Sequence, residues 1–127
     1  MRLLEIAGND AFRKELDDFM EFIEQRYNLH DFWLYPIGND TINLDSIIVD
    51  KAKRKQGVGS AVMQELIDYA DAEGYTIVLT PGSKDDAHGT TSRGRLVKFY
   101  KRFGFRENKG RSMDFAIGGG KMIRDPQ

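Results

Sequence analysis

The order in which helical and strand patterns follow one another is the feature that most constrains the fold of this chain. Three segments carry apolar residues every three or four positions, and short apolar or β-branched runs lie before, between and after them. The order is strand, helix, strands, helix, strand, helix, strands, which predicts a mixed sheet with helices packed on it. Because the chain has 127 residues, 40% of them hydrophobic, we expect one domain with its own core, residues 1–127.

The first part of the chain is expected to hold an edge strand, a helix and a hairpin. Arg2–Ala7 is a short apolar run that ends at Gly8-Asn9, and Asp10 is suited to cap the helix that follows. The helix has apolar residues at Phe12, Leu16, Phe19, Met20, Ile23 and Tyr27. Strands are predicted at Phe32–Ile37 and Thr41–Val49, joined by the turn Gly38-Asn39-Asp40 into an antiparallel hairpin.

The rest of the chain is expected to alternate helices with strands. Gly57 opens a helix that Gly74 ends in a left-handed conformation, and Tyr75–Thr80 is a buried strand. Pro81–Thr91 is polar and predicts a surface loop, after which Ser92 caps a helix ending at Phe103-Gly104. The last predicted elements are strands at Phe105–Glu107 and Ser112–Ile117, the turn Asn108-Lys109-Gly110 between them, and a flexible break at Gly118-Gly119-Gly120.

Composition excludes several classes of function. The 19 basic and 20 acidic side chains nearly cancel, so no global field attracts nucleic acid or a membrane. Cysteine is absent, which removes disulfides, thiolate metal sites and any covalent intermediate carried on sulfur. Neither His30 nor the carboxylates show metal-ligand spacing, and we predict no metal. The charged amino end lacks the apolar run of a signal peptide, which favours a cytoplasmic protein.

The most informative segment runs from Val49 to Ser60 and joins a strand to a helix through a basic loop. A helix amino terminus presents unpaired N–H groups and the positive end of its dipole. Glycines at Gly57 and Gly59 let a diphosphate approach those groups without an intervening Cβ. Lys51, Lys53, Arg54 and Lys55 add positive charge beside them, so the segment predicts a polyanionic ligand.

Two nucleotide-binding motifs do not fit this segment. The run G-x-x-x-x-G-K-[ST] of nucleoside-triphosphate loops does not occur in the sequence. The dinucleotide pattern G-x-G-x-x-G fails at its third glycine, where Val62 stands. The pattern that remains is Arg54-x-x-Gly57-x-Gly59 after the strand Leu44–Val49.

This pattern resembles the signature (Gln/Arg)-x-x-Gly-x-(Gly/Ala) of the GNAT superfamily of N-acetyltransferases. A second GNAT feature, aromatic-Tyr-x-x-x-Gly-Phe, is matched by Phe99-Tyr100 and Gly104-Phe105 at the usual separation from the first. The resemblance covers about Asp40 to Ile117. It departs from the family at Arg93, where an Asn is common, and at Leu96, where a small residue is usual.

The resemblance implies a fold and a donor substrate. The fold is α/β of the α+β type, with a mixed, mostly antiparallel central sheet and helices on both faces, as in acyl-CoA N-acyltransferases. The donor is acetyl-CoA, whose pantetheine arm would bind backbone groups of Ile47, Ile48 and Val49 as an added strand does. The remaining residues that the resemblance assigns to the coenzyme are Arg54, Lys55, Gln56, Gly57, Val58, Gly59, Ser60 and Tyr100.

For the chemistry, the resemblance assigns Tyr100 as the proton donor to the coenzyme sulfur, and a core aromatic is the alternative. A neutral amine attacks the thioester, and a strand amide near Ile48 stabilises the oxyanion. Asp45, expected on the same face as Asn43 and Ile47, is the first candidate for the general base, and a structural carboxylate is the alternative. His88, in the polar loop, is the second candidate base.

Two other functions remain as alternatives to N-acetyl transfer to a primary amine. The first is a coenzyme-A-binding module without catalysis that acts through protein contacts. The second is a nucleic-acid face formed by Lys51–Lys55 with Lys98, Lys101, Arg102 and Arg106, against which the balanced charge argues. The sequence leaves the acceptor open between an amine-bearing small molecule and a protein, and it leaves a homodimer open.

Overall fold

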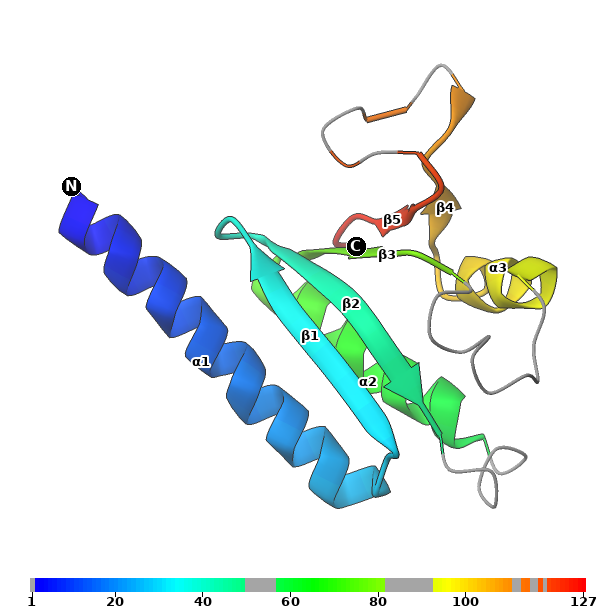
Figure 1. Ribbon diagram of the computed structural model, residues 1–127, viewed down its shortest axis with the longest axis horizontal. Helices are drawn as coiled ribbons and strands as arrows, with labels where there is room; N and C mark the ends of the chain where they lie inside the picture. The colour runs from blue at the N-terminus through cyan, green and yellow to red at the C-terminus, as the bar shows by residue number, and fades with distance from the viewer. Residues whose placement is uncertain (1, 50–56, 82–92, 111–112, 115–116, 118) are drawn as a thin grey trace.

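The computed structural model describes residues 2–49, 57–81, 93–110, 113–114, 117 and 119–127. The described elements are α1 (Arg2–Tyr27), β1 (Asp31–Ile37), β2 (Thr41–Ile48), α2 (Val58–Glu73), β3 (Thr76–Leu79), α3 (Arg93–Lys101), β4 (Arg106–Glu107) and β5 (Met122–Arg124). The described strands form one sheet in the order β1-β2-β3-β5-β4 (Figure 1). Among these described strands, only β2 and β3 pair in parallel, which confirms the mixed, mostly antiparallel sheet.

α1 is longer than predicted, because its amino-terminal part is helical. The edge strand expected at Arg2–Ala7 is wrong, and Asp10 lies inside the helix instead of capping it. Leu, Glu and Ala are strong helix formers, and one glycine costs a helix only about 1 kcal/mol, so Gly8 does not end α1. The predicted apolar stripe is confirmed farther along, since Phe12, Leu16, Met20 and Ile23 are buried.

β1 and β2 form the predicted antiparallel hairpin, with one irregularity. Trp33 pairs with Ser46 and Leu34 with Leu44, so Asp45 is an extra residue on β2 and forms a β-bulge. The turn after β1 contains Gly38 at φ 64°, a conformation that glycine adopts without strain. The backbone N–H of Thr76 donates to the carbonyl of Asp40 at 2.9 Å, which ties the start of β3 to this turn.

α2 begins after Gly57 and ends at Gly74, as predicted. Gly74 has φ 77°, and its N–H donates to the carbonyls at the helix end, which is a left-handed carboxyl-terminal cap. The buried stripe of α2 consists of Val62, Met63, Leu66, Ile67 and Ala70. β3 follows at once, so the strand predicted at Tyr75–Thr80 is confirmed over Thr76–Leu79.

The carboxyl-terminal segment differs from the prediction. β4 confirms the strand at Phe105–Glu107, but Met113, Asp114 and Ile117 are not in a strand, so the expected strand Ser112–Ile117 is wrong for these described residues. The buried Asn108 side chain holds the backbone of Asp114 in a turn, with bonds of 2.9 Å and 2.7 Å. The strand that follows in this segment is β5, at Met122–Arg124, and it was not predicted from the sequence.

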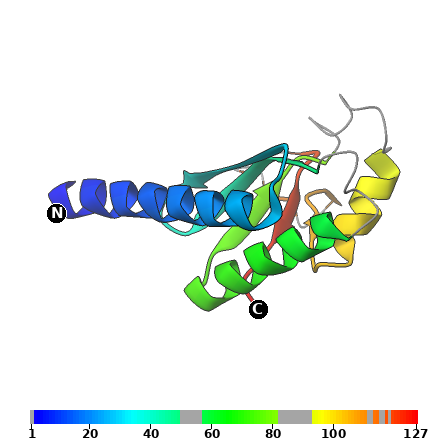
Figure 2. The same cartoon turned by 90° about the horizontal axis from the view of Figure 1, so that it is seen from below.

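The described helices lie on one face of the sheet, and helices on both faces are therefore not found. In Figure 1, α2 lies behind the hairpin, and Figure 2 shows the same arrangement from below. Ile77 and Leu79 of β3 join the core that the helices share, whereas Val78 between them does not. The connections β2–α2–β3 and β3–α3–β4 cross the sheet in the same direction, and right-handed crossovers then place both helices on the same side.

α1 is joined to α2 by tyrosine–glutamate hydrogen bonds. Tyr69 on α2 donates its hydroxyl to Glu15 on α1, and Tyr75 donates to the same carboxylate at 3.0 Å. Burial first, and then the Glu15 carboxylate, raise the pKa of both phenols, that of Tyr75 to about 12. The rings of Phe19 on α1 and Tyr69 on α2 stack with centroids 4.5 Å apart. Both apolar and polar contacts therefore hold α1 against α2.

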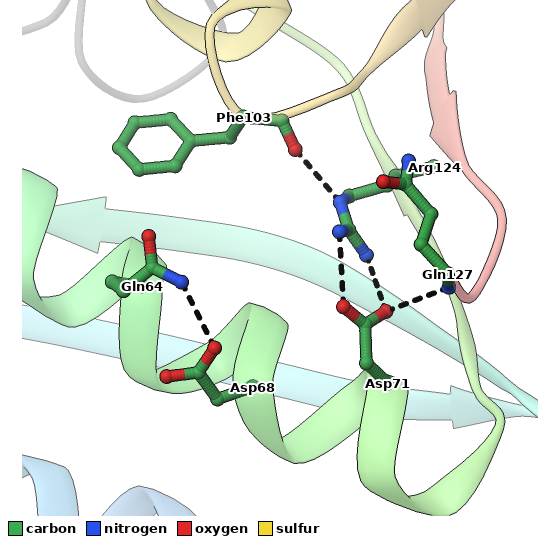
Figure 3. Close-up of polar contacts among 6 residues, drawn as sticks. All are labelled: Gln64, Asp68, Asp71, Phe103, Arg124 and Gln127. Carbon is green, nitrogen blue, oxygen red and sulfur yellow. Dashed lines mark hydrogen bonds and ion pairs between the residues drawn. The ribbon is translucent and has the colours of Figure 1, made fainter.

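Arg124 on β5 joins the ends of α2 and α3 (Figure 3). Its side chain is 5% exposed and donates to both oxygens of Asp71, at 2.6 Å and 3.1 Å, and to the carbonyl of Phe103 at 2.7 Å. The hydrogen bond from Arg124 is the first cause that lowers the pKa of Asp71. The backbone N–H of Gln127 also donates to Asp71, so this group ties down the carboxyl-terminal residues.

A search of the described helices for a membrane span finds none that combines sufficient length with sufficient apolarity.

Candidate functional site

The carboxyl-terminal end of β2 has an edge that β3 does not cover. β2 pairs with β3 only from Thr41 to Leu44, whereas its pairing with β1 continues to Ile48. The carbonyl of Ile48 accepts a hydrogen bond from the N–H of His30 at 3.0 Å, so the backbone polar groups of Ile48 point toward β1. Because successive residues of a strand direct their polar groups to alternate sides, the N–H and carbonyl of Ile47 face the uncovered edge.

The amino terminus of α2 lies beside this edge. Gly57 has φ 74°, and no side chain caps the helix in the part of the chain that the structure describes. A Cβ added at Gly59 would lie 3.8 Å from a methyl of Val49, so Val49, which directly follows β2, lies next to the first turn of α2. A Cβ added at Gly57 would meet no described atom within 4 Å, which leaves room for a ligand.

This terminus has the donors that a diphosphate needs. The first N–H groups of a helix, here those of Val58, Gly59 and Ser60, have no partner within the helix. They also lie at the positive end of the helix dipole, which attracts anions. The geometry therefore fits a phosphorylated ligand whose remaining part extends along the uncovered edge of β2.

The β-bulge changes the face to which the candidate base was assigned. Asn43 pairs with Tyr35 and Ile47 pairs with Phe32, and these partners are three residues apart on β1. Asn43 and Ile47 therefore lie on opposite faces, so the expectation that Asp45 shares one face with both is wrong. The alternation rule fails here because Asp45 is the inserted residue, and its side chain is partly exposed.

Tyr100 lies in the core, on α3. It is 4% exposed, and its ring contacts those of Phe99 and Phe105 with centroids 5.3 Å and 5.7 Å apart. Ile47 and Val58 pack against the cluster that contains Tyr100. The structure thus brings Tyr100 into the same hydrophobic cluster as the end of β2 and the start of α2.

Several predicted site residues lie outside the described part of the chain. These are His88, the second candidate base, and the basic-loop residues Arg54, Lys55 and Gln56. Their assignments stay predictions. A metal site can be assessed only for the described residues, where no three His, Asp or Glu side chains gather in a way that could hold an ion.

The structure also shows polar residues that the sequence analysis did not select. Arg93, the departure from the family pattern, donates to the carbonyl of Pro81 at 2.9 Å and to that of Gly120 at 3.2 Å. It thereby anchors the first residue of α3. The hairpin also brings together three residues that were not predicted as site residues, Asp31, Trp33 and Ser46. One indication of this group is present in the sequence, because Trp33 is the single tryptophan of the chain.

A family model described as an acetyltransferase (GNAT) domain matches residues 22–107, more than half of the chain. The chain belongs to the GNAT acetyltransferase family. The matched region contains β1, β2, α2, β3 and α3, and so the uncovered edge and the amino terminus of α2. Comparison with curated protein sequences gives no match.

Solved GNAT structures share the fold of this GNAT domain. Ard1 from Thermoplasma volcanium has a TM-score of 0.50 and 19% identity, over 76% of this chain and 62% of that one. A GNAT-family acetyltransferase from Staphylococcus aureus has a TM-score of 0.51 and 20% identity, over 74% of this chain and 57% of that one. A GNAT-family acetyltransferase from Elizabethkingia anophelis, solved with acetyl-CoA bound, has a TM-score of 0.50 and 21% identity, over 74% of this chain and 66% of that one. The chain thus spans about three fifths of the length of these proteins.

Proposed function

We propose that this GNAT domain transfers an acetyl group directly from acetyl-CoA to a primary amine, in the cytoplasm. The observation that carries the proposal is the amino terminus of α2, which no described side chain caps, beside the edge of β2 that β3 does not cover. Family membership supports acetyl transfer in general. The acetyl-CoA bound to the Elizabethkingia anophelis relative supports the choice of donor.

The donor is expected to bind in two parts. The diphosphate accepts hydrogen bonds from the N–H groups at Val58, Gly59 and Ser60, with the predicted basic-loop residues beside it. The pantetheine arm lies along the uncovered edge, where the polar backbone groups of Ile47 serve it as a neighbouring strand would. With the arm in this place, the thioester lies near the bulge.

The chemistry follows from that placement. The neutral amine attacks the thioester carbon, a tetrahedral oxyanion forms, and the N–H of a residue at the end of β2 stabilises it. The attack forms the carbon–nitrogen bond, and collapse of the intermediate re-forms the carbonyl, breaks the carbon–sulfur bond and leaves the amide. Tyr100 donates a proton to the departing thiolate, and Asp45 or His88 accepts the proton that the amine loses.

The first experiment compares glycine variants at the two ends of α2. Gly57 and Gly74 have nearly the same φ, 74° and 77°, and an added Cβ meets no described atom within 4 Å at either. Gly57→Ala and Gly74→Ala should therefore each cost roughly 1 to 2 kcal/mol of stability. Coenzyme A at a hundred times its dissociation constant stabilises a protein by about 2.7 kcal/mol, or about 10 °C for this length.

We expect the coenzyme to raise the melting temperature of the wild type and of Gly74→Ala, and to raise that of Gly57→Ala much less. An equal loss in both variants, or a full shift in Gly57→Ala, contradicts the assigned site. Coenzyme binding without acetyl transfer to any amine supports the alternative of a module that acts through protein contacts. Salt-dependent nucleic-acid binding without coenzyme binding supports the other alternative.

A further inference from the structure

The β1–β2 hairpin presents a surface on the side of the sheet away from the described helices. Its members are Asp31, Trp33 and Tyr35 on β1 and Ser46 on β2, and we call them the hairpin outer face. Phe32 and Leu34, which alternate with them, belong to the core under the helices. Trp33 is 48% exposed, so this face is open at its centre.

Asp31 is held in place on this face. The hydroxyl of Ser46, which is 4% exposed, donates to one carboxylate oxygen of Asp31 at 2.5 Å. Trp33 pairs directly with Ser46 in the register, so the indole and the carboxylate both lie next to this serine. A fixed carboxylate beside an exposed aromatic ring is an arrangement that binds organic cations.

The charges of the hairpin strands favour a cation. β1 and β2 contain only two charged residues, Asp31 and Asp45, and both are acidic. The Asp31 carboxylate, beside the exposed ring of Trp33, attracts a cationic ligand from solution. The hairpin outer face therefore differs from the amino terminus of α2, which attracts anions.

The hairpin outer face lies close to the thioester position of the proposed reaction. Asp31 pairs with Ile48, and paired residues have Cα atoms about 5 Å apart. Ile47, whose N–H faces the uncovered edge, is the next residue. Since α2 lies on the helix side, the donor enters from that side, and an acceptor on the hairpin outer face reaches the same edge from the other.

We propose that Asp31 and Trp33 form a subsite for a second positive charge on the acceptor, so that the preferred acceptor is a diamine or polyamine. This proposal rests on the proposed acetyl transfer. The bound charge is a second one because an ammonium between a carboxylate and an indole is stabilised in its protonated form. The amine that attacks the thioester must instead be neutral, and it lies beyond the subsite, at Ile47.

Trp33 is the only tryptophan in the chain, so its fluorescence reports on this subsite alone. We would titrate the protein with 1,4-diaminobutane, and with 1,4-butanediol as the uncharged probe of similar size. The diamine should change the fluorescence and the diol should not. Asp31→Asn keeps an oxygen that accepts the Ser46 hydroxyl, so it should fold, and it should weaken diamine binding at least tenfold.

Asp40→Asn is the matched control. Asp40 also accepts a hydroxyl, that of Thr41 at 3.0 Å, but it lies at the other end of the hairpin. This variant should bind the diamine as the wild type does. Equal weakening in both variants, or no fluorescence response in the wild type, overturns the subsite. A dimer in sedimentation that Trp33→Leu dissociates, together with no diamine response, identifies the face as a surface for a second copy and also overturns it.

Acetylation rates separate this proposal from the proposed function. The ratio of kcat/KM for 1,4-diaminobutane to that for butylamine should exceed ten in the wild type and approach one in Asp31→Asn and Trp33→Leu. The coenzyme melting shift should be unchanged in both variants. If the diamine binds in an Asp31-dependent way but the coenzyme gives no shift, the subsite stands and the proposed function fails. If the coenzyme binds and the ratio is the same in all proteins, the subsite fails.

Discussion

Replacement of Arg124 by methionine should destabilise the protein strongly, and the loss in the free energy of unfolding can be worked out from the structure. The guanidinium is almost fully buried and donates to Asp71 and to the carbonyl of Phe103. Loss of one partner of a buried ion pair costs about 3 to 5 kcal/mol. Asp71 keeps 24% of its side chain exposed and would be partly hydrated, so we expect the lower end, about 3 kcal/mol.

Urea denaturation with Arg106→Met as the control tests this value. Arg106 lies on the neighbouring β4 and pairs with Asp125 at 3.5 Å, but the two side chains are 50% and 64% exposed. An exposed pair of this kind contributes at most about 1 kcal/mol. For Arg124→Met we expect a melting temperature lower by about 10 °C with an unchanged urea m-value. A loss no larger than that of Arg106→Met refutes the structural role assigned to Arg124.

The same ion pair predicts a dependence on pH. Because the folded protein lowers the pKa of Asp71, its contribution is complete above the ordinary carboxylate pKa of about 4. The contribution is lost as the pH falls through the lower pKa of the folded state. Asp71→Asn should therefore be less stable than the wild type at pH 7, and the difference should shrink toward pH 2 in urea titrations.

Two further predictions concern tyrosines. The pKa of Tyr75, raised to about 12, means that stability is complete below pH 10 and is lost as the pH rises from 10 toward 12; Tyr75→Phe should reduce this loss in urea titrations, and an unchanged loss would assign it to other groups. Tyr100→Phe keeps the buried ring, so it should leave the coenzyme melting shift intact and lower kcat by about 10² to 10⁴. An unchanged kcat would remove Tyr100 from the mechanism.

Sequence patterns predicted the elements whose signals are local. The stripe of α1 from Phe12 onward, the hairpin turn at Gly38 and the caps of α2 at Gly57 and Gly74 all depend on a few neighbouring residues. β5 could not be predicted in this way. It contains three residues, too few to show a period, and it is a strand because β3 and β4 pair with it from both sides.

The candidate site divides in the same manner. The glycine pattern located the amino terminus of α2, because Gly57 has a left-handed backbone conformation, which glycine adopts more readily than other residues. The face of Asp45 could not be found, because nothing in Leu44-Asp45-Ser46 marks an inserted residue. The position of the bulge is set by pairing with β1, where Trp33 meets Ser46 and Leu34 meets Leu44.

The bulge connects the two sides of the proposed reaction. Without the extra residue, alternation from Leu44 would place Ser46 under the helices, where a buried hydroxyl without a partner costs about 1 to 3 kcal/mol. It would also turn Ile47 outward. With the bulge, Ile47 packs against the core beside the start of α2, while Ser46 reaches the hairpin outer face and holds Asp31. One inserted residue therefore supplies both the apolar support of the donor edge and the polar support of the proposed acceptor subsite.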